Sequence, residues 1–238
     1  VAKQMARFRD FFPFTFVLMA GDNIYGGSSP ADFQKKFEVP YRDLLDGGVK
    51  FYASLGNHDS PNQRFYKPFN MGEKRYYTVK QGNVEFFALD STYMDPVQID
   101  WLKSRLQASN AAWKIAYFHH PLYSNAFRHG PDEDLKARIE PIFKQFGVRV
   151  VFSGHEHVYE RFKPQGGIYY FIVGSSGQLR PHDLKRSPIT AKGFDLDQAF
   201  LLAEIAGEQL HFQVISRTGK TVDSGVIEYP AKTSGAGN

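Results

Sequence analysis

Four short polar clusters, each directly after an apolar, strand-like run, constrain the fold of this chain more than any other feature. They are Gly21-Asp22-Asn23-Ile24-Tyr25, Gly56-Asn57-His58-Asp59, His119-His120-Pro121 and Gly154-His155-Glu156-His157. In open α/β sheets the loops at the carboxyl ends of the strands converge on one crevice. Residues far apart in the sequence are therefore expected to meet at one edge of a sheet.

Strand-like and helical runs alternate over the first two thirds of the chain, which is typical of stacked β-α-β units. We expect helices at 1–9, 30–45, 97–106 and 132–146, with a kink or an early break at Pro141. Strands are expected at 14–20, 49–55, 75–80, 84–88, 113–118 and 148–152. After Gly166-Gly167 the pattern becomes all-β, with strands at 168–173, 200–205, 210–215 and 222–229.

No linker, repeat or low-complexity segment divides the chain. The simplest interpretation is one α/β domain over residues 1–230, in which two mixed β-sheets pack face to face and helices cover the outside. Residues 231–238 are small and polar, and we expect this tail to fray.

Composition excludes several classes of protein. The chain has 238 residues, of which 42% are hydrophobic, and its formal charge of +4 is dispersed, so a nucleic-acid groove is not expected. No apolar run is long enough for a membrane helix. Cysteine is absent, so any metal must be bound by His, carboxylate, amide or phenolate groups.

Each cluster alone has a simpler explanation, because Asp in a turn or a packed imidazole is common. Together they favour a metal centre. His155 and His157 alternate in an extended segment and project to one side. Six of the eight histidines fall in these loops or just beyond one, namely His58, His119, His120, His129, His155 and His157. Imidazole, carboxylate, amide and phenolate groups suit zinc, manganese or iron.

The order Gly-Asp-x-x-Tyr, Gly-Asn-His-Asp, His-x-Pro, Gly-His-x-His resembles the calcineurin-like metallophosphoesterases, and specifically the purple (tartrate-resistant type) acid phosphatases. The resemblance implies two metal ions, Fe(III) and a divalent Zn, Mn or Fe. Asp22 would bridge them, Tyr25 and His157 would bind the ferric ion, and Asn57, His119 and His155 would bind the divalent ion. His58 would lie at the mouth of the site. His129, in a His-Gly-Pro segment, would assist on the substrate side, although a solvated loop histidine is an alternative there.

These roles imply hydrolysis of small phosphomonoesters to inorganic phosphate, with a metal-bound hydroxide attacking phosphorus and a histidine as general acid. A phosphodiesterase or nucleotide pyrophosphatase on the same metals is the first alternative. A non-catalytic binding protein with a degenerate site is the second. The resemblance also suggests a secreted or periplasmic location.

One family feature has no counterpart in the sequence. The first motif of the family, a Gly-Asp-x-Gly-like turn after the first strand, supplies another carboxylate to the ferric site, but Asp10 lacks the neighbouring glycines. We expect that the sequence omits this strand and motif, because a helix starting at Val1 would follow such a strand in a β-α-β unit.

The roles of several neighbouring residues stay open. His120 either supports the ligands or faces away, and Asp59 and Asp90 either orient an imidazole or bond within turns. Glu156 projects away from its neighbours and is not expected to be a ligand. The segment 180–186 either attracts an anionic substrate or is a solvated loop.

Overall fold

The computed structural model describes residues 1–229. The tail expected to fray, together with Pro230, lies outside these described residues. None of the described helices is both long and apolar enough to cross a bilayer.

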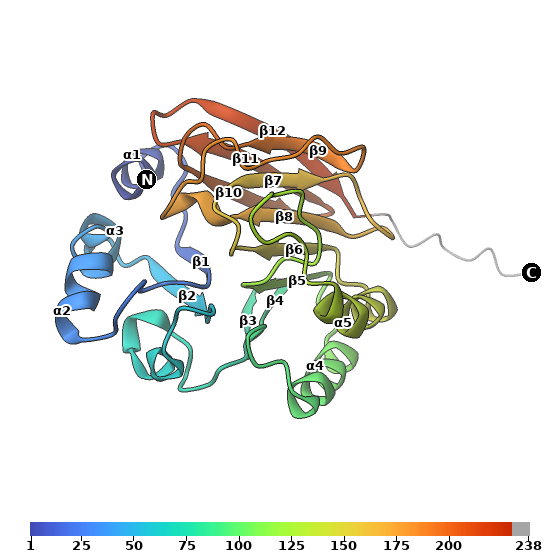
Figure 1. The fold of residues 1–238 in the computed structure, drawn as a ribbon. Helices are drawn as coiled ribbons and strands as arrows, with labels where there is room; N and C mark the ends of the chain where they lie inside the picture. The colour runs from blue at the N-terminus through green and yellow to red at the C-terminus, as the bar shows by residue number, and fades with distance from the viewer. Residues whose placement is uncertain (230–238) are drawn as a thin grey trace, which may run out of the picture.

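A seven-stranded mixed sheet forms the centre of the fold, in the order β3-β4-β5-β6-β8-β7-β9 (Figure 1). Its strands are β3 (Tyr77–Gln81), β4 (Val84–Ala88), β5 (Trp113–Phe118), β6 (Val150–Ser153), β7 (Tyr159–Phe162), β8 (Tyr169–Val173) and β9 (Thr190–Phe194). Strands β4, β5, β6 and β8 run parallel, so their carboxyl ends lie at one edge.

Two smaller sheets face this one. Strands β1 (Phe16–Ala20) and β2 (Lys50–Ser54) pair in parallel. Strands β10 (Ala199–Ala206), β11 (Gln209–Ser216) and β12 (Thr221–Glu228) form an antiparallel sheet. Figure 1 shows both along the same side of the central sheet.

Helices cover the outside. The α-helices are α1 (Ala2–Arg9), α2 (Pro30–Phe33), α3 (Arg42–Asp46), α4 (Pro96–Ala108) and α5 (Glu133–Phe146). A π-turn, Gln34–Glu38, joins the second helix to Pro40, and short 3₁₀ turns lie at Pro61–Phe65, Lys67–Phe69 and Gly174–Ser176. Helices α2, α4 and α5 begin at side-chain caps, Ser29, Asp95 and Asp132, as such residues favour.

Alternation along the central strands divides the core into two layers. Phe86, Ile115 and Tyr117 face the two smaller sheets, whereas the neighbouring Phe87 and Ala116 face α4 and α5. The expected α/β fold, with two mixed layers of sheet flanked by helices, is therefore confirmed, and the second layer consists of two separate sheets.

Several expected elements differ in detail. The helix expected at 30–45 is interrupted before Pro40, which cannot continue the hydrogen-bond ladder. Helix α5 does not end at Pro141, because the proline lies on its exposed face, where water can replace the lost bond. Strands β7 and β9 were not expected, since charged residues interrupt both of them.

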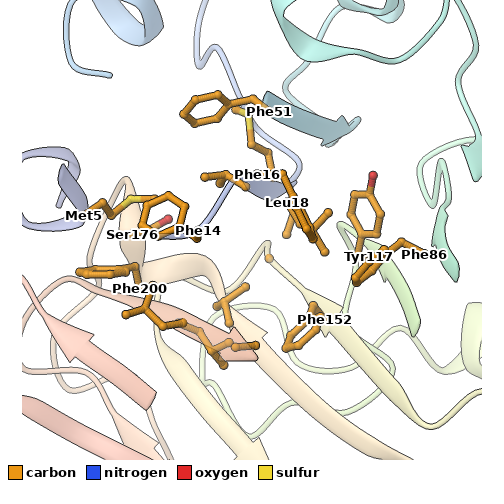
Figure 2. A pocket seen from close by; sticks show the side chains of 18 of the residues that line it. Met5, Phe14, Phe16, Leu18, Phe51, Phe86, Tyr117, Phe152, Ser176 and Phe200 are labelled. Atoms are coloured by element: carbon orange, nitrogen blue, oxygen red, sulfur yellow. The ribbon is translucent and has the colours of Figure 1, made fainter. Parts of the chain in front are cut away.

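A large apolar cavity separates the two smaller sheets. Its volume is about 800 Å³, and its walls are Phe14, Phe16 and Leu18 beside β1 and Phe200 on β10, with Phe152 at its floor (Figure 2). Among the described residues, β1 pairs only with β2 and β10 only with β11. Each strand therefore leaves one edge without a partner strand.

An ion pair joins β7 to the antiparallel sheet. The Asp223 carboxylate of β12 accepts hydrogen bonds from Arg161 Nε at 2.7 Å and Tyr159 Oη at 2.6 Å. Burial opposes ionisation of Asp223, but these two donors outweigh it and lower the pKa of the carboxyl.

Asp223→Ala is expected to lower the free energy of unfolding by about 2 kcal/mol, because it leaves the half-buried Arg161 without the acceptor of its charge-assisted hydrogen bonds. Urea unfolding measures the change, and Glu228→Ala, at an exposed position of the same strand, is the matched control. Since the folded-state pKa is lowered, the stabilisation is present above a pH of about 4 and lost as the pH falls. Equal effects of the two substitutions at pH 7 would contradict this prediction.

Candidate metal centre

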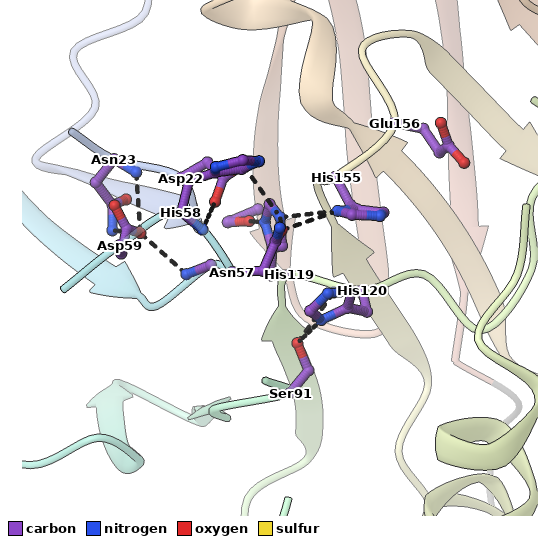
Figure 3. A network of polar contacts seen from close by, with 12 residues as sticks. Asp22, Asn23, Asn57, His58, Asp59, Ser91, His119, His120, His155 and Glu156 are labelled. Carbon is purple, nitrogen blue, oxygen red and sulfur yellow. Dashed lines mark hydrogen bonds and ion pairs between the residues drawn. The ribbon is translucent and has the colours of Figure 1, made fainter. Parts of the chain in front are cut away.

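The four polar clusters meet at the carboxyl ends of parallel strands. Asp22 follows β1, Asn57 follows β2, His119 follows β5 and His155 follows β6. The first two strands belong to a smaller sheet and the other two to the central sheet, so the site bridges the two layers (Figures 1 and 3).

Three side-chain atoms of the clusters surround His119 Nε2 (Figure 3). His119 Nε2 lies 2.9 Å from Asn57 Oδ1, 3.1 Å from His155 Nδ1 and 3.4 Å from Asp22 Oδ2. His155 Nδ1 is also 3.2 Å from Asn57 Oδ1. A tetrahedral ion with bonds of about 2.0–2.1 Å separates its ligand atoms by about 3.3 Å. The separations therefore fit one small divalent cation.

The tautomer of His119 supports this role. Its Nδ1 lies 2.9 Å from the carbonyl oxygen of Ala20, so the ring donates there and leaves the Nε2 lone pair facing the other three atoms. Metal-binding histidines typically donate their second ring N–H in this way.

Glycines allow the ligand loops to approach closely. A Cβ at Gly21 would lie 2.6 Å from His119 Nδ1, and one at Gly56 would lie 2.2 Å from Asp22 Oδ1. Either contact is shorter than heavy atoms tolerate. The glycines of the Gly-Asp and Gly-Asn-His motifs are thus required by packing around the ligands.

Two of the converging residues have unusual backbone conformations. Asp22 has φ 54° and His155 has φ 66°, in the left-handed region that side-chain-bearing residues avoid. Such strain tends to occur at functional sites, where surrounding contacts maintain it. Here the Asp22 carboxylate also accepts a hydrogen bond from the His58 amide at 3.0 Å.

The surroundings lower the pKa of both His155 and Asp22. Burial, with His119 and His120 nearby, lowers the pKa of His155 to about 3. Burial opposes ionisation of Asp22, but the hydrogen bond and charge of His119 lower the pKa of its carboxyl. Neutral imidazole and carboxylate are the forms that bind metal ions.

Tyr25, His58 and His157 lie beside this group. The Tyr25 ring lies 4.2 Å from the His58 ring and 6.4 Å from the His157 ring, between centroids. His58 is exposed and Tyr25 is 38% exposed, so both border the opening of the site. Tyr25 is thus a neighbour of both histidines.

His129 lies beside His155. Its ring centroid is 4.4 Å from that of His155, and the residue is exposed. Burial, with Arg180 and Arg128 nearby, lowers the pKa of its imidazole. The structure therefore brings all eight residues singled out from the sequence to one site.

The neighbouring carboxylates have structural contacts. Asp59 accepts hydrogen bonds from the amides of Asn23, Ile24 and Gly56, joining two ligand loops. Asp90 bonds to Arg75 and to the amides that follow it. Both make turn contacts, and no hydrogen bond to an imidazole is recorded for either among residues 1–229.

His120 belongs to the same group of rings. Its Nδ1 lies 2.9 Å from Ser91 Oγ, and burial with His119 nearby lowers the pKa of the imidazole to about 4. His119, His120 and His155 each offer a nitrogen within 4.8 Å of the others. Ser91, which no sequence motif indicated, holds His120 beside the ligands.

Arg180 belongs to the segment 180–186, for which the sequence left both anion attraction and a solvated loop open. Its amide donates a hydrogen bond to the His157 carbonyl oxygen at 2.9 Å. Burial is the main cause that lowers the pKa of the His129 and His157 imidazoles, and the positive charge of the Arg180 guanidinium lowers both further. It is therefore part of the wall of the site. Only its place in a basic run hinted at this.

Comparison with known proteins places these observations in a family. A family model described as calcineurin-like phosphoesterase matches residues 3–159. Human tartrate-resistant acid phosphatase type 5 is 24% identical over 269 residues, covering 93% of this chain and 81% of the relative. Purple acid phosphatase 17 of Arabidopsis thaliana is 23% identical over 268 residues, covering 91% and 79%.

Solved structures share the fold. GAP50, described as the anchor in the inner membrane complex of Plasmodium, has a TM-score of 0.81 at 18% identity, covering 98% of this chain and 84% of that one. The purple acid phosphatase PPD1 of yellow lupin has a TM-score of 0.76 at 17% identity, covering 95% and 48%.

Proposed function

The chain belongs to the calcineurin-like phosphoesterase family, and from this premise we propose that it hydrolyses small phosphomonoesters at a centre of two metal ions. The observation that carries the proposal is the convergence of Asn57, His155 and Asp22 on His119 Nε2, at distances of 2.9, 3.1 and 3.4 Å. Asp22, with two carboxylate oxygens, suits the position between two cations.

We assign the remaining residues by position. Asn57, His119 and His155 would hold a divalent ion, and Tyr25 and His157 a ferric ion, with Asp22 shared. When bound, the ions supply Lewis acidity that activates water and neutralises phosphoryl charge. His58, exposed at the opening, would contact the phosphate or protonate the leaving oxygen. His129 would assist from the substrate side.

The first experiment compares turnover of p-nitrophenyl phosphate and its bis-ester, alongside the metal content per chain. Preferential hydrolysis of the monoester, with close to two metals per chain and one of them iron, supports the proposal. Preference for the bis-ester would indicate a phosphodiesterase or nucleotide pyrophosphatase. No turnover and no metal, even after incubation with iron, zinc and manganese, would indicate a binding protein.

Tyr25→Phe is expected to remove any visible absorption band of the iron-loaded protein while the fold survives. The phenolate oxygen is the group that would give charge transfer to ferric iron, and the 38% exposed ring contributes little to the core. Absorption and circular dichroism spectra measure the two effects. A band retained in the variant would contradict the tyrosinate assignment.

The apolar cavity suggests what completes the domain. We propose that it receives an additional strand, preceding α1 and pairing with the free edges of β1 and β10. Such a strand would join the two smaller sheets and bury the Phe16 and Phe200 side chains that line the cavity. Because β1 leads into Asp22, the carboxyl end of a parallel neighbour would add a carboxylate beside the metal centre.

The comparison of the 238-residue chain with the complete gene product tests this strand. The longer protein is expected to bind less of a hydrophobic dye and to hold more iron. Equal dye binding and equal metal content, or a complete product of the same 238 residues, would contradict the proposal. A secreted or periplasmic location is proposed from the family resemblance alone, and fractionation of expressing cells tests it.

A further inference from the structure

Two buried glutamates lie behind the metal centre and have no part in the proposed chemistry. Glu156 sits between the ligands His155 and His157, and Glu160 follows on β7. Both side chains belong to residues with 0% exposure. Burying a carboxylate is costly, and an apolar residue would serve stability as well. Their contacts therefore need an explanation beyond packing.

The chain bends between Gly154 and Tyr159, and these bends separate the two sets of side chains. His155 lies beside His119 and His157 beside Tyr25, whereas Glu156 and Glu160 contact the loop 125–130. Figure 3 shows the Glu156 side chain directed away from His155 and the other labelled ligands. The glutamates thus face the loop Asn125–Gly130, which carries His129 and is called the His129 loop below.

Each glutamate binds one end of the His129 loop. Glu156 Oε1 accepts a hydrogen bond from the Gly130 amide at 2.7 Å. Glu160 accepts from the Asn125 amide at 3.0 Å and from Asn125 Nδ2 at 2.8 Å. Charge-assisted bonds of this kind are stronger and more directional than neutral ones.

The middle of the loop is fixed by backbone contacts. Phe127 donates its amide to the Asp183 carbonyl oxygen at 2.7 Å, and Ala126 forms an antiparallel bridge with Leu184. The Arg180 guanidinium lies 3.8 Å from Glu156 Oε2 and 3.6 Å from Asp183 Oδ2, which balances the buried charge. The exposed His129 side chain is therefore carried by a backbone held at both ends and in the middle.

We propose that Glu156 and Glu160 are positioning residues that fix the position of the His129 imidazole relative to the substrate. The same segment, 155–160, then fixes both the proposed metal ligands His155 and His157 and, through the two glutamates, the loop that carries His129, whose assistance we take to be proton donation to the leaving oxygen. A displacement of about 1 Å is enough to impair an oriented catalytic group. This inference rests on the proposed phosphatase function and on the role assigned to His129 in it.

The test uses leaving groups of different basicity. Proton donation matters more for an alkyl phosphate such as glycerol phosphate than for p-nitrophenyl phosphate, whose phenolate leaves readily. His129→Ala is expected to lower kcat/KM by about 100-fold for glycerol phosphate and by less than about fivefold for p-nitrophenyl phosphate. Glu156→Gln and Glu160→Gln are expected to reproduce this split at about tenfold, with unchanged metal content.

Double variants and a matched control separate positioning from a general structural role. In the His129→Ala background, either glutamine substitution is expected to change kcat/KM by less than about twofold, because the positioned group is gone. Glu85→Gln replaces another buried glutamate, at the far end of β4, and is expected to leave the ratio of the two substrates unchanged. If Glu156→Gln fails to fold, Glu160→Gln still tests the proposal, and Asn125→Ala removes the Glu160 contact from the loop side.

The possible outcomes distinguish a failure of this inference from a failure of the proposed phosphatase function. Equal losses for both substrates in Glu156→Gln and Glu160→Gln, or losses that multiply with that of His129→Ala, would overturn it while the phosphatase function stands. The absence of any leaving-group effect in His129→Ala would overturn it together with the role of His129. No turnover of either substrate by the unsubstituted, metal-loaded protein would overturn the proposed function itself.

Discussion

Replacing Asp22 by Asn is expected to abolish turnover of p-nitrophenyl phosphate, by a factor on the order of 10³ or more. Asn has almost the same shape but no charge, so it can neither bridge two cations nor offset their repulsion. The Asp22 carboxylate is also the acceptor for the His58 amide, which ties the two loops at the site. Metal analysis should show both ions lost or strongly depleted.

The control for Asp22→Asn is Asp59→Asn, in the neighbouring loop. Asp59 holds three backbone amides and Gln63, so its replacement is expected to reduce stability more than metal content. If Asp22→Asn kept both metals and its activity, the shared-ligand assignment would be wrong. Chemical denaturation of both variants shows whether a loss of activity simply follows unfolding.

His119→Ala is expected to produce the second largest effect, with loss of the divalent ion and a fall in turnover on the order of 10³-fold. The imidazole is 1% exposed and its Nε2 faces three other ligand atoms, so no neighbouring group can replace it. The adjacent His120 bonds to Ser91, and His120→Ala is expected to reduce activity by only about 10–100-fold.

His211→Ala provides the unaffected reference, because His211 is exposed on β11 and bonds only to Gln209 among the described residues. Turnover and metal content are measured in all three variants. Equal losses in the His119 and His120 variants would show that both are direct ligands. No loss in His119→Ala would remove the central residue of the proposed divalent site.

Much of the site was predictable because the signal is local. Each proposed ligand closely follows an apolar run, and the carboxyl ends of parallel strands lie at one edge of a sheet. The sequence alone therefore predicted that Asp22, Asn57, His119 and His155 lie together. The confirmed fold class followed from the same alternation of strands and helices. The assignment of these residues as ligands remains a prediction until metals are measured.

Other features depend on contacts that no local pattern records. Strand β7 carries Glu160 and Arg161, whose charges are typical of a surface segment, yet Asn125 in a distant loop bonds to Glu160 and Asp223 on β12 bonds to Arg161. Pro141 predicted an early end of its helix. The helix continues because the proline is exposed, so water can replace the lost hydrogen bond. The function inferred for Glu156 likewise requires the three-dimensional proximity of a loop that lies about 26 positions earlier.

The left-handed backbone at Asp22 and His155 has a consequence for protein engineering. An L-residue in that conformation costs about 1–2 kcal/mol, which glycine avoids. A design method that rewards backbone propensity would therefore choose glycine at both positions and remove two of the proposed metal ligands. Selection for thermal stability therefore favours glycine at positions 22 and 155, whereas selection for the proposed metal binding favours Asp and His there.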